Sequence, residues 1–265
     1  MVARITAALA LLLMPGTAAA SLVLDRTRVV IADTDRDTVL RVHNDGEAPA
    51  LVTSWLGRSA HESVPEHEDV PFVLLPPLVR VDGGQQQALR ILSTGQPLPA
   101  DRESLFWLHV LEIPQRPAQD DGTLQLAVQT TLKVFARPPG LAMAVDTAAR
   151  GLRWQLAREP DAARCALVID NPAPLHVTLT GVQLHAEEAS HGLAEAAALV
   201  APLGRTRAAL QRCPPAGTPT GALTYTFLDD QGDAHTGAAS LVSVDATGAS
   251  PAAALSSLPT EPRSP

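Results

Sequence analysis

The stretch GTLQLAVQTTLKVFARPPG, residues 122–140, is the part of the chain from which the fold can best be inferred. From Leu124 to Val134, apolar residues occupy almost every second position, which is typical of a strand with one buried face. Lys133 lies on the other side of this strand, and it is the single lysine of a chain whose other cationic side chains are arginines. Taken alone, Lys133 has an ordinary interpretation as a solvated residue on the polar face.

Similar short apolar segments, separated by turn-forming residues, occur on the N-terminal side of this stretch. They are SLVLDRTRVVI (21–31), TVLRVHN (38–44), ALVTSWLG (50–57), FVLLPPLVRVD (72–82), QQALRILST (86–94) and SLFWLHVLEI (104–113). About seven short strands at this spacing predict an antiparallel sandwich of immunoglobulin-like kind.

Beyond the stiff segment RPPGLAM (137–143), strand-like segments resume as far as residue 245. We therefore predict an all-β chain with two immunoglobulin-like β-sandwich domains, residues 21–138 and 139–245. Residues 187–200 show weak helical periodicity, and their alanines leave the choice of helix or strand open. The tail at 246–265 is rich in Ala, Ser, Pro and Thr, and we expect it to be disordered.

The first 20 residues have the composition of a secretory leader. Arg4 precedes an apolar run from Ile5 to Met14, and three alanines end the segment at Ala20. The run is about half of the ~20 residues that a membrane-spanning helix needs, so we expect cleavage after Ala20 rather than anchoring. In an exported protein, the two cysteines, Cys165 and Cys213, are more often paired in a disulfide than reactive.

Composition and motifs exclude several classes of protein. The formal net charge of −8 argues against a nucleic-acid-binding protein. We find no nucleophile elbow, phosphate-binding loop or dinucleotide fingerprint, and we expect no enzymatic activity, cofactor or small-molecule substrate. HESVPEHED, residues 61–69, lacks the spacing of a helical zinc site and is interpreted as a solvated acidic loop.

Three segments together carry a resemblance to a known family. LDRTR (24–28), LPADRESLFWLHVLEIP (98–114) and QTTLKVFARP (129–138) resemble, in order and spacing, the periplasmic chaperones of the chaperone–usher pilus pathway. NP at 171–172 and FLDDQG at 227–232 extend the resemblance into the second half. It implies a periplasmic protein with two immunoglobulin-like domains in an L-shaped arrangement around a cleft. The short connection from Pro114 to Thr123 is similar to the branch of the family that builds rod-like pili.

The resemblance implies roles for particular residues. Arg28 and Lys133 match the family's basic pair, which binds the C-terminal carboxylate of a pilus subunit. Leu124, Leu126 and Val128 match the strand lent to the subunit's apolar groove in donor-strand complementation. Glu103, Arg137 and Asp230 match an interdomain ion-pair network, and Pro77 and Leu78 match a surface that contacts the outer-membrane usher. His109 departs from the family, which usually has Asn at this position.

The function expected from this resemblance is that of a chaperone that binds pilus subunits, prevents their aggregation and delivers them to the usher. The partners would be pilus subunits and the usher, without membrane insertion. A secreted β-sandwich adhesin or pilus structural subunit is the alternative from another class, and an esterase-like enzyme is a third. Two predicted domains and a chain that starts directly with a strand favour the chaperone.

Overall fold

The computed structural model describes residues 21–32, 37–61, 70–115, 125–158, 164–186, 189–214 and 221–243. Contacts divide the chain into two units, which we describe separately. Unit 1 extends to Pro97 and continues at Leu105–Val134, while unit 2 comprises Leu98–Ser104 and the chain from Phe135 onward. The predicted leader, residues 1–20, and the predicted tail, residues 246–265, lie outside the described residues. No helix in the described ranges is long and apolar enough to span a membrane.

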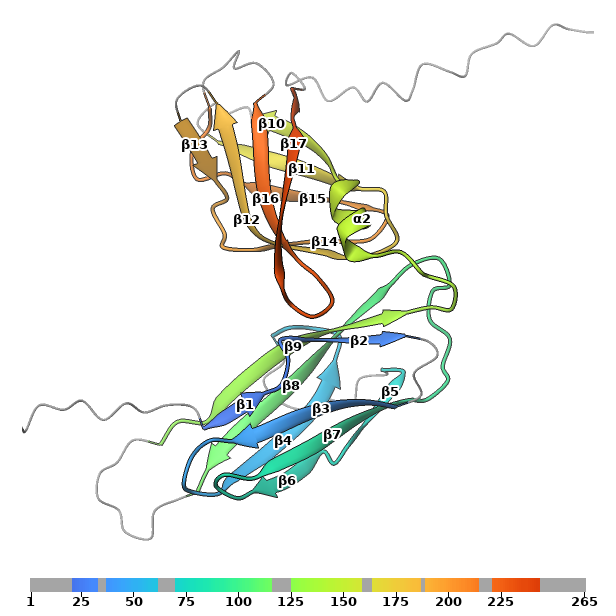
Figure 1. Cartoon of the computed structure of the whole chain (residues 1–265), viewed down its shortest axis with the longest axis vertical. Coiled ribbons are helices and arrows are strands. Elements are labelled where there is room, and N and C mark those ends of the chain that lie inside the picture. Colours follow the sequence, from blue (N-terminus) through green and yellow to red (C-terminus); the bar gives the residue numbers. More distant parts are fainter. Residues whose placement is uncertain are drawn as a thin grey trace, which may run out of the picture. The chain divides into compact units, whose positions relative to one another are not determined.

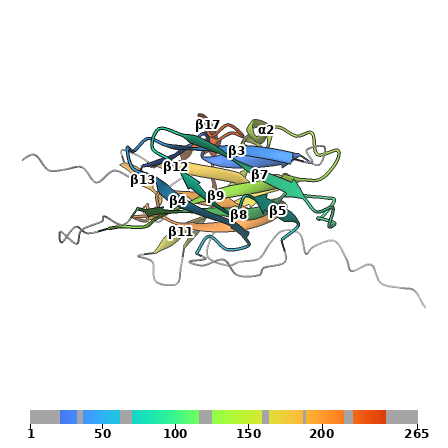
Figure 2. The same cartoon turned by 90° about the horizontal axis from the view of Figure 1, so that it is seen from below.

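Unit 1 is a sandwich of two sheets (Figure 1). One sheet has the order β1-β3-β7-β5 and consists of β1 (Leu22–Leu24), β3 (Asp37–Asn44), β7 (Gln86–Ser93) and β5 (Phe72–Leu75). The other has the order β2-β9-β8-β4-β6 and consists of β2 (Arg28–Ala32), β9 (Val128–Arg137), β8 (Ser104–Pro114), β4 (Ala50–Gly57) and β6 (Leu78–Val81). Figure 2 shows β3 in one layer, with β4 and β8 in the other.

Alternate residues of these strands fill the space between the two sheets, as period-2 patterning requires. Fully buried apolar side chains in this core include Val29, Leu40, Val52, Leu89, Phe106, Leu108 and Val134. The apolar alternation noted in the sequence therefore identifies the buried face of unit 1.

Two segments that we predicted as continuous strands are each divided between the sheets. Residues 21–31 form β1 in one sheet and β2 in the other, with a bend at Asp25–Thr27. Residues 72–82 form β5 and β6, which are separated at Pro76 and Pro77. Proline has no amide hydrogen for the ladder, so a strand ends there. Alternation alone does not reveal such a change of sheet, because the buried face continues on both sides of the break.

Where it is described, unit 2 is a second sandwich with one short helix. Its sheets are β15-β11-β10-β18 and β13-β12-β16-β17, with β14 paired to β12. The elements are α2 (Val145–Arg150), β10 (Arg153–Arg158), β11 (Cys165–Asn171), β12 (Val177–Ala186), β13 (Ala189–Gly192), β14 (Ala198–Val200), β15 (Gly204–Ala209), β16 (Ala222–Leu228), β17 (Ala234–Ser240) and β18 (Val242–Ser243). The segment at 187–200, left open in the sequence, contains two strands where it is described. The predicted all-β fold is confirmed.

Both units use a buried asparagine to hold a loop at the end of a strand. The amide of Asn44 donates to the carbonyls of Ala48 and Val81, and the amide of Asn171 donates to those of Leu175 and Ala201. Each asparagine therefore satisfies backbone groups that the loop would otherwise bury without partners.

The two cysteines are joined in unit 2, as predicted. Cys165 on β11 is bonded to Cys213, and their Cα atoms lie 5.5 Å apart. β15 is the neighbour of β11 in the sheet, and the disulfide links the start of β11 to the segment that follows β15.

Candidate functional site

The single lysine lies beside an arginine on adjacent strands of unit 1. Lys133 is on β9 and Arg28 begins β2, which is the next strand in the sheet. Since Val29 and Leu132 face the core, the alternation places Arg28 and Lys133 on the opposite side of the sheet. Burial and the positive charge of Arg28 lower the pKa of the Lys133 ammonium below its usual value.

The aromatic ring of Trp107 lies beside the Lys133 ammonium. The Lys133 Nζ atom lies 5.5 Å from the centroid of this ring, within the range of a cation–π contact. In the described part of the chain, no carboxylate lies within ion-pair distance of Lys133. The arrangement thus holds an ammonium that is half buried and close to another cation, which is a site that an anion would stabilise.

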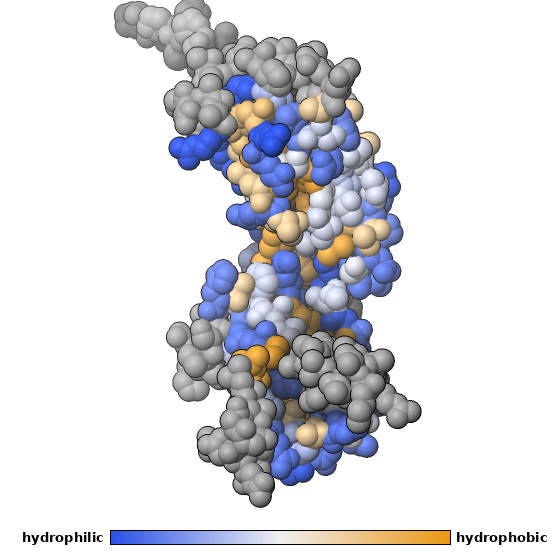
Figure 3. Space-filling model, turned by 90° about the vertical axis from the view of Figure 1, so that its left-hand side faces the viewer, coloured by the Kyte–Doolittle hydropathy of each residue, from blue (hydrophilic) through white to orange (hydrophobic). Residues whose placement is uncertain are grey.

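The apolar residues of the same strand differ sharply in exposure. Leu132 and Val134 are 3% and 0% exposed, whereas Val128 and Leu126 are 36% and 60% exposed. β9 begins at Val128, so Leu126 precedes the strand, although we predicted that the strand would start earlier. Leu124 lies outside the described residues. On the face that Figure 3 draws, hydrophobic residues lie among hydrophilic ones at the surface.

The edge of β9 is only partly covered. β8 lies on one side of β9, and β2 lies on the other. β2 has five residues and β9 has ten, so in the described part of the chain β2 can pair with at most half of this edge. In Figure 1, β2 points in the same direction as β9 and lies beside its C-terminal half. Among the described residues, no strand other than β2 flanks this edge, so the part of β9 near Val128 is accessible to an added strand.

A buried histidine holds the exposed end of β9 in place. His109 is fully buried on β8, and its Nδ1 atom lies 3.1 Å from Thr131 Oγ1 and 3.1 Å from Gln129 Nε2. Its Nε2 atom lies 3.0 Å from the carbonyl of Ser59, so Nε2 donates and Nδ1 accepts. In the sequence, His109 stood out only as a departure from the family pattern, and Trp107 was not identified as part of a site.

The three predicted ion-pair residues meet in unit 2, with a fourth member. Arg137 donates from Nε to Glu103 at 2.8 Å and from its two terminal nitrogens to Asp230 at 2.7 and 2.6 Å. Burial disfavours the guanidinium charge, but hydrogen bonds from Arg137 to Asp230 and Glu103 outweigh it and raise the pKa of Arg137. Glu103 also accepts from the backbone nitrogen of His176, with the His176 ring at 2.8 Å.

This network was predicted to join the two domains, and a role in their orientation stays a prediction. All four side chains belong to unit 2, because the segment around Glu103 packs with that unit. Asp230 lies in the turn between β16 and β17, which explains why residues far apart in sequence meet.

The remaining predicted residues lie on the surface of unit 1. Pro77 and Leu78 are both exposed at the start of β6, and the Pro77 carbonyl accepts from the Ser54 amide at 2.8 Å. Of the acidic segment at 61–69, all but His61 lies outside the described residues. Among the described side chains, no group of three His, Cys, Asp or Glu could hold a metal ion.

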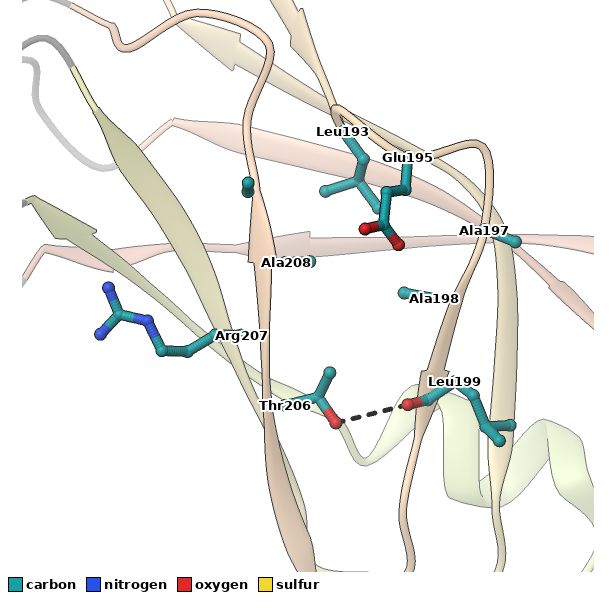
Figure 4. Close-up of a pocket in the computed structure, with 9 residues that line it drawn as sticks. Leu193, Glu195, Ala197, Ala198, Leu199, Thr206, Arg207 and Ala208 are labelled. Atoms are coloured by element: carbon teal, nitrogen blue, oxygen red, sulfur yellow. Dashed lines mark hydrogen bonds between the residues drawn. The ribbon is translucent and has the colours of Figure 1, made fainter. Parts of the chain in front are cut away.

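A pocket in unit 2 lacks the features of a chemical site. It lies beside β14 and β15, and alanines form much of its lining (Figure 4). Glu195 lines it, but the Arg207 side chain points away from this carboxylate. The Thr206 hydroxyl is used within the fold, where it donates to the Leu199 carbonyl at 3.4 Å. The pocket therefore offers no convergent set of polar groups.

Comparisons with known proteins identify the family of the chain. Residues 21–142 match the family described as pili and flagellar-assembly chaperone, PapD N-terminal domain, and residues 147–239 match pili assembly chaperone PapD, C-terminal domain. The chaperone protein FimB/FhaD of Bordetella pertussis is 38% identical over 237 residues, which cover 87% of this chain and 92% of the relative.

Solved structures agree with these matches. The YadV chaperone of Escherichia coli has a TM-score of 0.70 and 29% identity, and the match covers 84% of this chain and 100% of that one. The Salmonella enterica SafB chaperone in complex with the SafA pilin has a TM-score of 0.66 and 27% identity, covering 85% and 99%. Because these matches extend over both units, the chain belongs to the PapD family of pilus-assembly chaperones, whose role is not enzymatic.

Proposed function

We propose that this chaperone captures a pilus subunit by binding its C-terminal carboxylate at Arg28 and Lys133 and lending it the exposed part of β9. The observation that carries the proposal is that two cationic side chains, Arg28 and Lys133, lie close together on adjacent strands. Two cations on adjacent strands repel each other, and burial adds to the cost of the Lys133 charge. A carboxylate between them would remove this repulsion and would receive charge-assisted hydrogen bonds from both.

The exposed end of β9 supports strand donation. Leu126 and Val128 are the apolar residues at this end, and Leu124 would continue the same alternation. A subunit that lacks one strand exposes a groove and an edge, and β9 could pair with that edge while its apolar side chains fill the groove. The carboxylate site would set the register, because a slip of one residue turns each side chain to the wrong face. The complex of SafB with a pilin supports this function by analogy.

The finer roles form part of the same proposal. The protein would act in the periplasm after cleavage behind Ala20 and would pass subunits to the outer-membrane usher, with Pro77 and Leu78 at the usher-contacting surface. Glu103, Arg137 and Asp230 would help to orient the two domains. The alternative of an adhesin or pilus subunit has no observation in its favour.

Substitution of Lys133 tests the proposal. Co-expression with a candidate pilin, followed by pull-down from the periplasm, should show that Lys133→Ala loses about 2–5 kcal/mol of binding, or roughly 30- to 5,000-fold. The melting temperature should change little, because Lys133 packs in no core. Lys133→Arg should also bind less well than the parent, since its longer planar head displaces the carboxylate.

Arg28→Ala provides the companion measurement. It should weaken capture as Lys133→Ala does, and the double variant should be little worse than either, because both cations serve one anion. Undiminished capture by Lys133→Ala would overturn the proposal and leave Lys133 as a solvated side chain.

A further inference from the structure

A carboxylate stands in the core-facing row of β8. Leu108, Val110 and Glu112 alternate along this strand, and all three are buried, with Glu112 only 7% exposed. A buried carboxylate is costly unless hydrogen bonds or a cation compensate its charge. The contacts of Glu112 therefore need an explanation. The chaperone function proposed above does not supply one.

Within the part of the chain that the structure describes, the hydrogen bonds to this carboxylate all come from Ser21 and Leu22. The backbone nitrogen of Ser21 lies 3.2 Å from Oε1, and that of Leu22 lies 3.2 Å from Oε2. The Ser21 hydroxyl also donates to Oε1. In the described ranges, no lysine or arginine side chain forms an ion pair with Glu112.

The fold holds Ser21 firmly in this position. The amide of Asp45 donates to the Ser21 carbonyl at 2.7 Å, and Leu22 begins β1, which pairs with β3. A side chain at Gly46 would collide with Ser21, because a Cβ built there would lie 2.9 Å from that of Ser21. The Ser21 nitrogen thus reaches Glu112 through the packing of the surrounding strand.

The chemical state of this nitrogen depends on processing. In the precursor it belongs to the Ala20–Ser21 amide and carries one hydrogen. Hydrolysis of this bond consumes one water and yields the Ala20 carboxylate and a free amine on Ser21. An α-amino group has an ordinary pKa of about 7.7–8.0, so near neutral pH it is mostly an ammonium.

We propose that Glu112 is a built-in counter-ion for the α-ammonium that leader cleavage creates at Ser21. The site then exchanges a neutral amide donor for a cationic one, and the hydrogen bond becomes charge-assisted. Leader cleavage therefore neutralises the buried charge of Glu112 and stabilises the position of β1. The precursor lacks this stabilisation. The inference rests on the proposed cleavage after Ala20, and it is independent of pilus-subunit binding.

A thermodynamic cycle tests the pair. We compare the unfolding of a chain that begins at Ser21 with that of a chain carrying an added glycine before Ser21, each with its N-terminus verified by mass. The same two chains are made with Glu112→Gln. In the parent, the added glycine should raise the unfolding constant at least tenfold, which equals about 1.4 kcal/mol. In Glu112→Gln, the glycine should have much less effect.

Asp45→Asn is the matched control, because Asp45 is an exposed carboxylate beside Ser21 that does not contact its amine. In this variant the glycine should cost as much as in the parent. An equal cost in Glu112→Gln would indicate a steric effect and would overturn the proposal, as would no cost in the parent.

Amine labelling provides a second readout that does not depend on the folding of Glu112→Gln. A mature chain beginning at Ser21 has two amines, the Ser21 nitrogen and the single lysine, so mass spectrometry can follow each one. In the folded parent, acetylation at Ser21 should be at least tenfold slower than in the urea-unfolded chain, and forced acetylation should lower the melting temperature. Equal rates would overturn the proposal. A periplasmic chain that begins elsewhere would instead refute the cleavage site on which the inference rests.

Discussion

The C-terminal half of β9 and the segment that leads into its start carry the same kind of apolar residue, yet only the C-terminal half is buried. Leu132 and Val134 lie in the core of unit 1, whereas Leu126 and Val128 are exposed beyond it. The difference arises because Leu132 and Val134 lie between the two sheets, whereas Leu126 precedes the strand and Val128 lies at its start. A continuous apolar pattern can therefore serve two purposes, internal packing at one end and binding at the other.

A charge at the exposed end should produce the largest effect on binding. Leu126→Glu should abolish capture of a pilus subunit, because a carboxylate in an apolar groove loses hydration without gaining a partner, at a cost of several kcal/mol. Pull-down with a co-expressed pilin measures the loss, and circular dichroism should show an unchanged fold. A variant that still protects the subunit from aggregation would mean that Leu126 does not enter its groove.

Truncation at the buried end should affect stability instead. Leu132→Ala should lower the free energy of unfolding by about 2–5 kcal/mol, since it leaves a cavity in the core of unit 1. Leu126→Ala is the matched control and should change stability by less than about 0.5 kcal/mol. Urea denaturation measures both, and similar losses in the two variants would contradict the division of the strand.

Within β9, His109 should matter for the exposed end and not for the buried one. His109→Phe keeps a ring against Trp55 but leaves Gln129 and Thr131 without this partner, at a cost of about 1–3 kcal/mol. We measure amide hydrogen exchange in His109→Phe and in the parent. The substitution should accelerate exchange at Gln129–Thr131 more than at Leu132–Val134. His43→Phe, on the exposed surface of unit 1, serves as the control. Uniform acceleration along β9 would argue against a local role.

The smallest expected effect is a dependence of stability on alkaline pH. Burial and Arg28 depress the pKa of Lys133 in the folded chain, so its ammonium is a penalty at neutral pH. In the unfolded chain the pKa of Lys133 is about 10.5. As the pH rises towards this value, Lys133 loses its proton in the folded chain before it does so in the unfolded chain. The free energy of unfolding should therefore increase over this range of pH. Melting curves of the parent and Lys133→Met measure the difference. A difference that stays constant with pH would contradict the burial of an unneutralised charge.

Much of the fold could be predicted from alternation and turn residues, and the errors have physical causes. Residues 21–31 and 72–82 each form two strands, because a chain can change sheets without interrupting its apolar pattern. The helix Val145–Arg150 was not predicted, since six residues give too short a period to recognise. The disulfide was predicted from compartment and cysteine number, and the structure joins the same two cysteines.

For the site, the resemblance identified residues, but their environment required the structure. Arg28 and Lys133 are more than 100 positions apart, and only the pairing order β2-β9 brings them together. Trp107 and His109 were missed because an aromatic or imidazole ring within a strand is ordinarily part of the packing. His176 was missed as the fourth member of the Arg137 network for the same reason.

The sequence by itself determined the all-β class, the two sandwiches, the family and the position of the single lysine, because strand alternation and motif spacing are local properties of the chain. Tertiary structure decided which apolar residues are buried, which cations are neighbours and where Glu112 finds its donors. Burial and electrostatic energy depend on the distance between groups in space, and in a sandwich of antiparallel sheets those groups come from strands far apart in sequence.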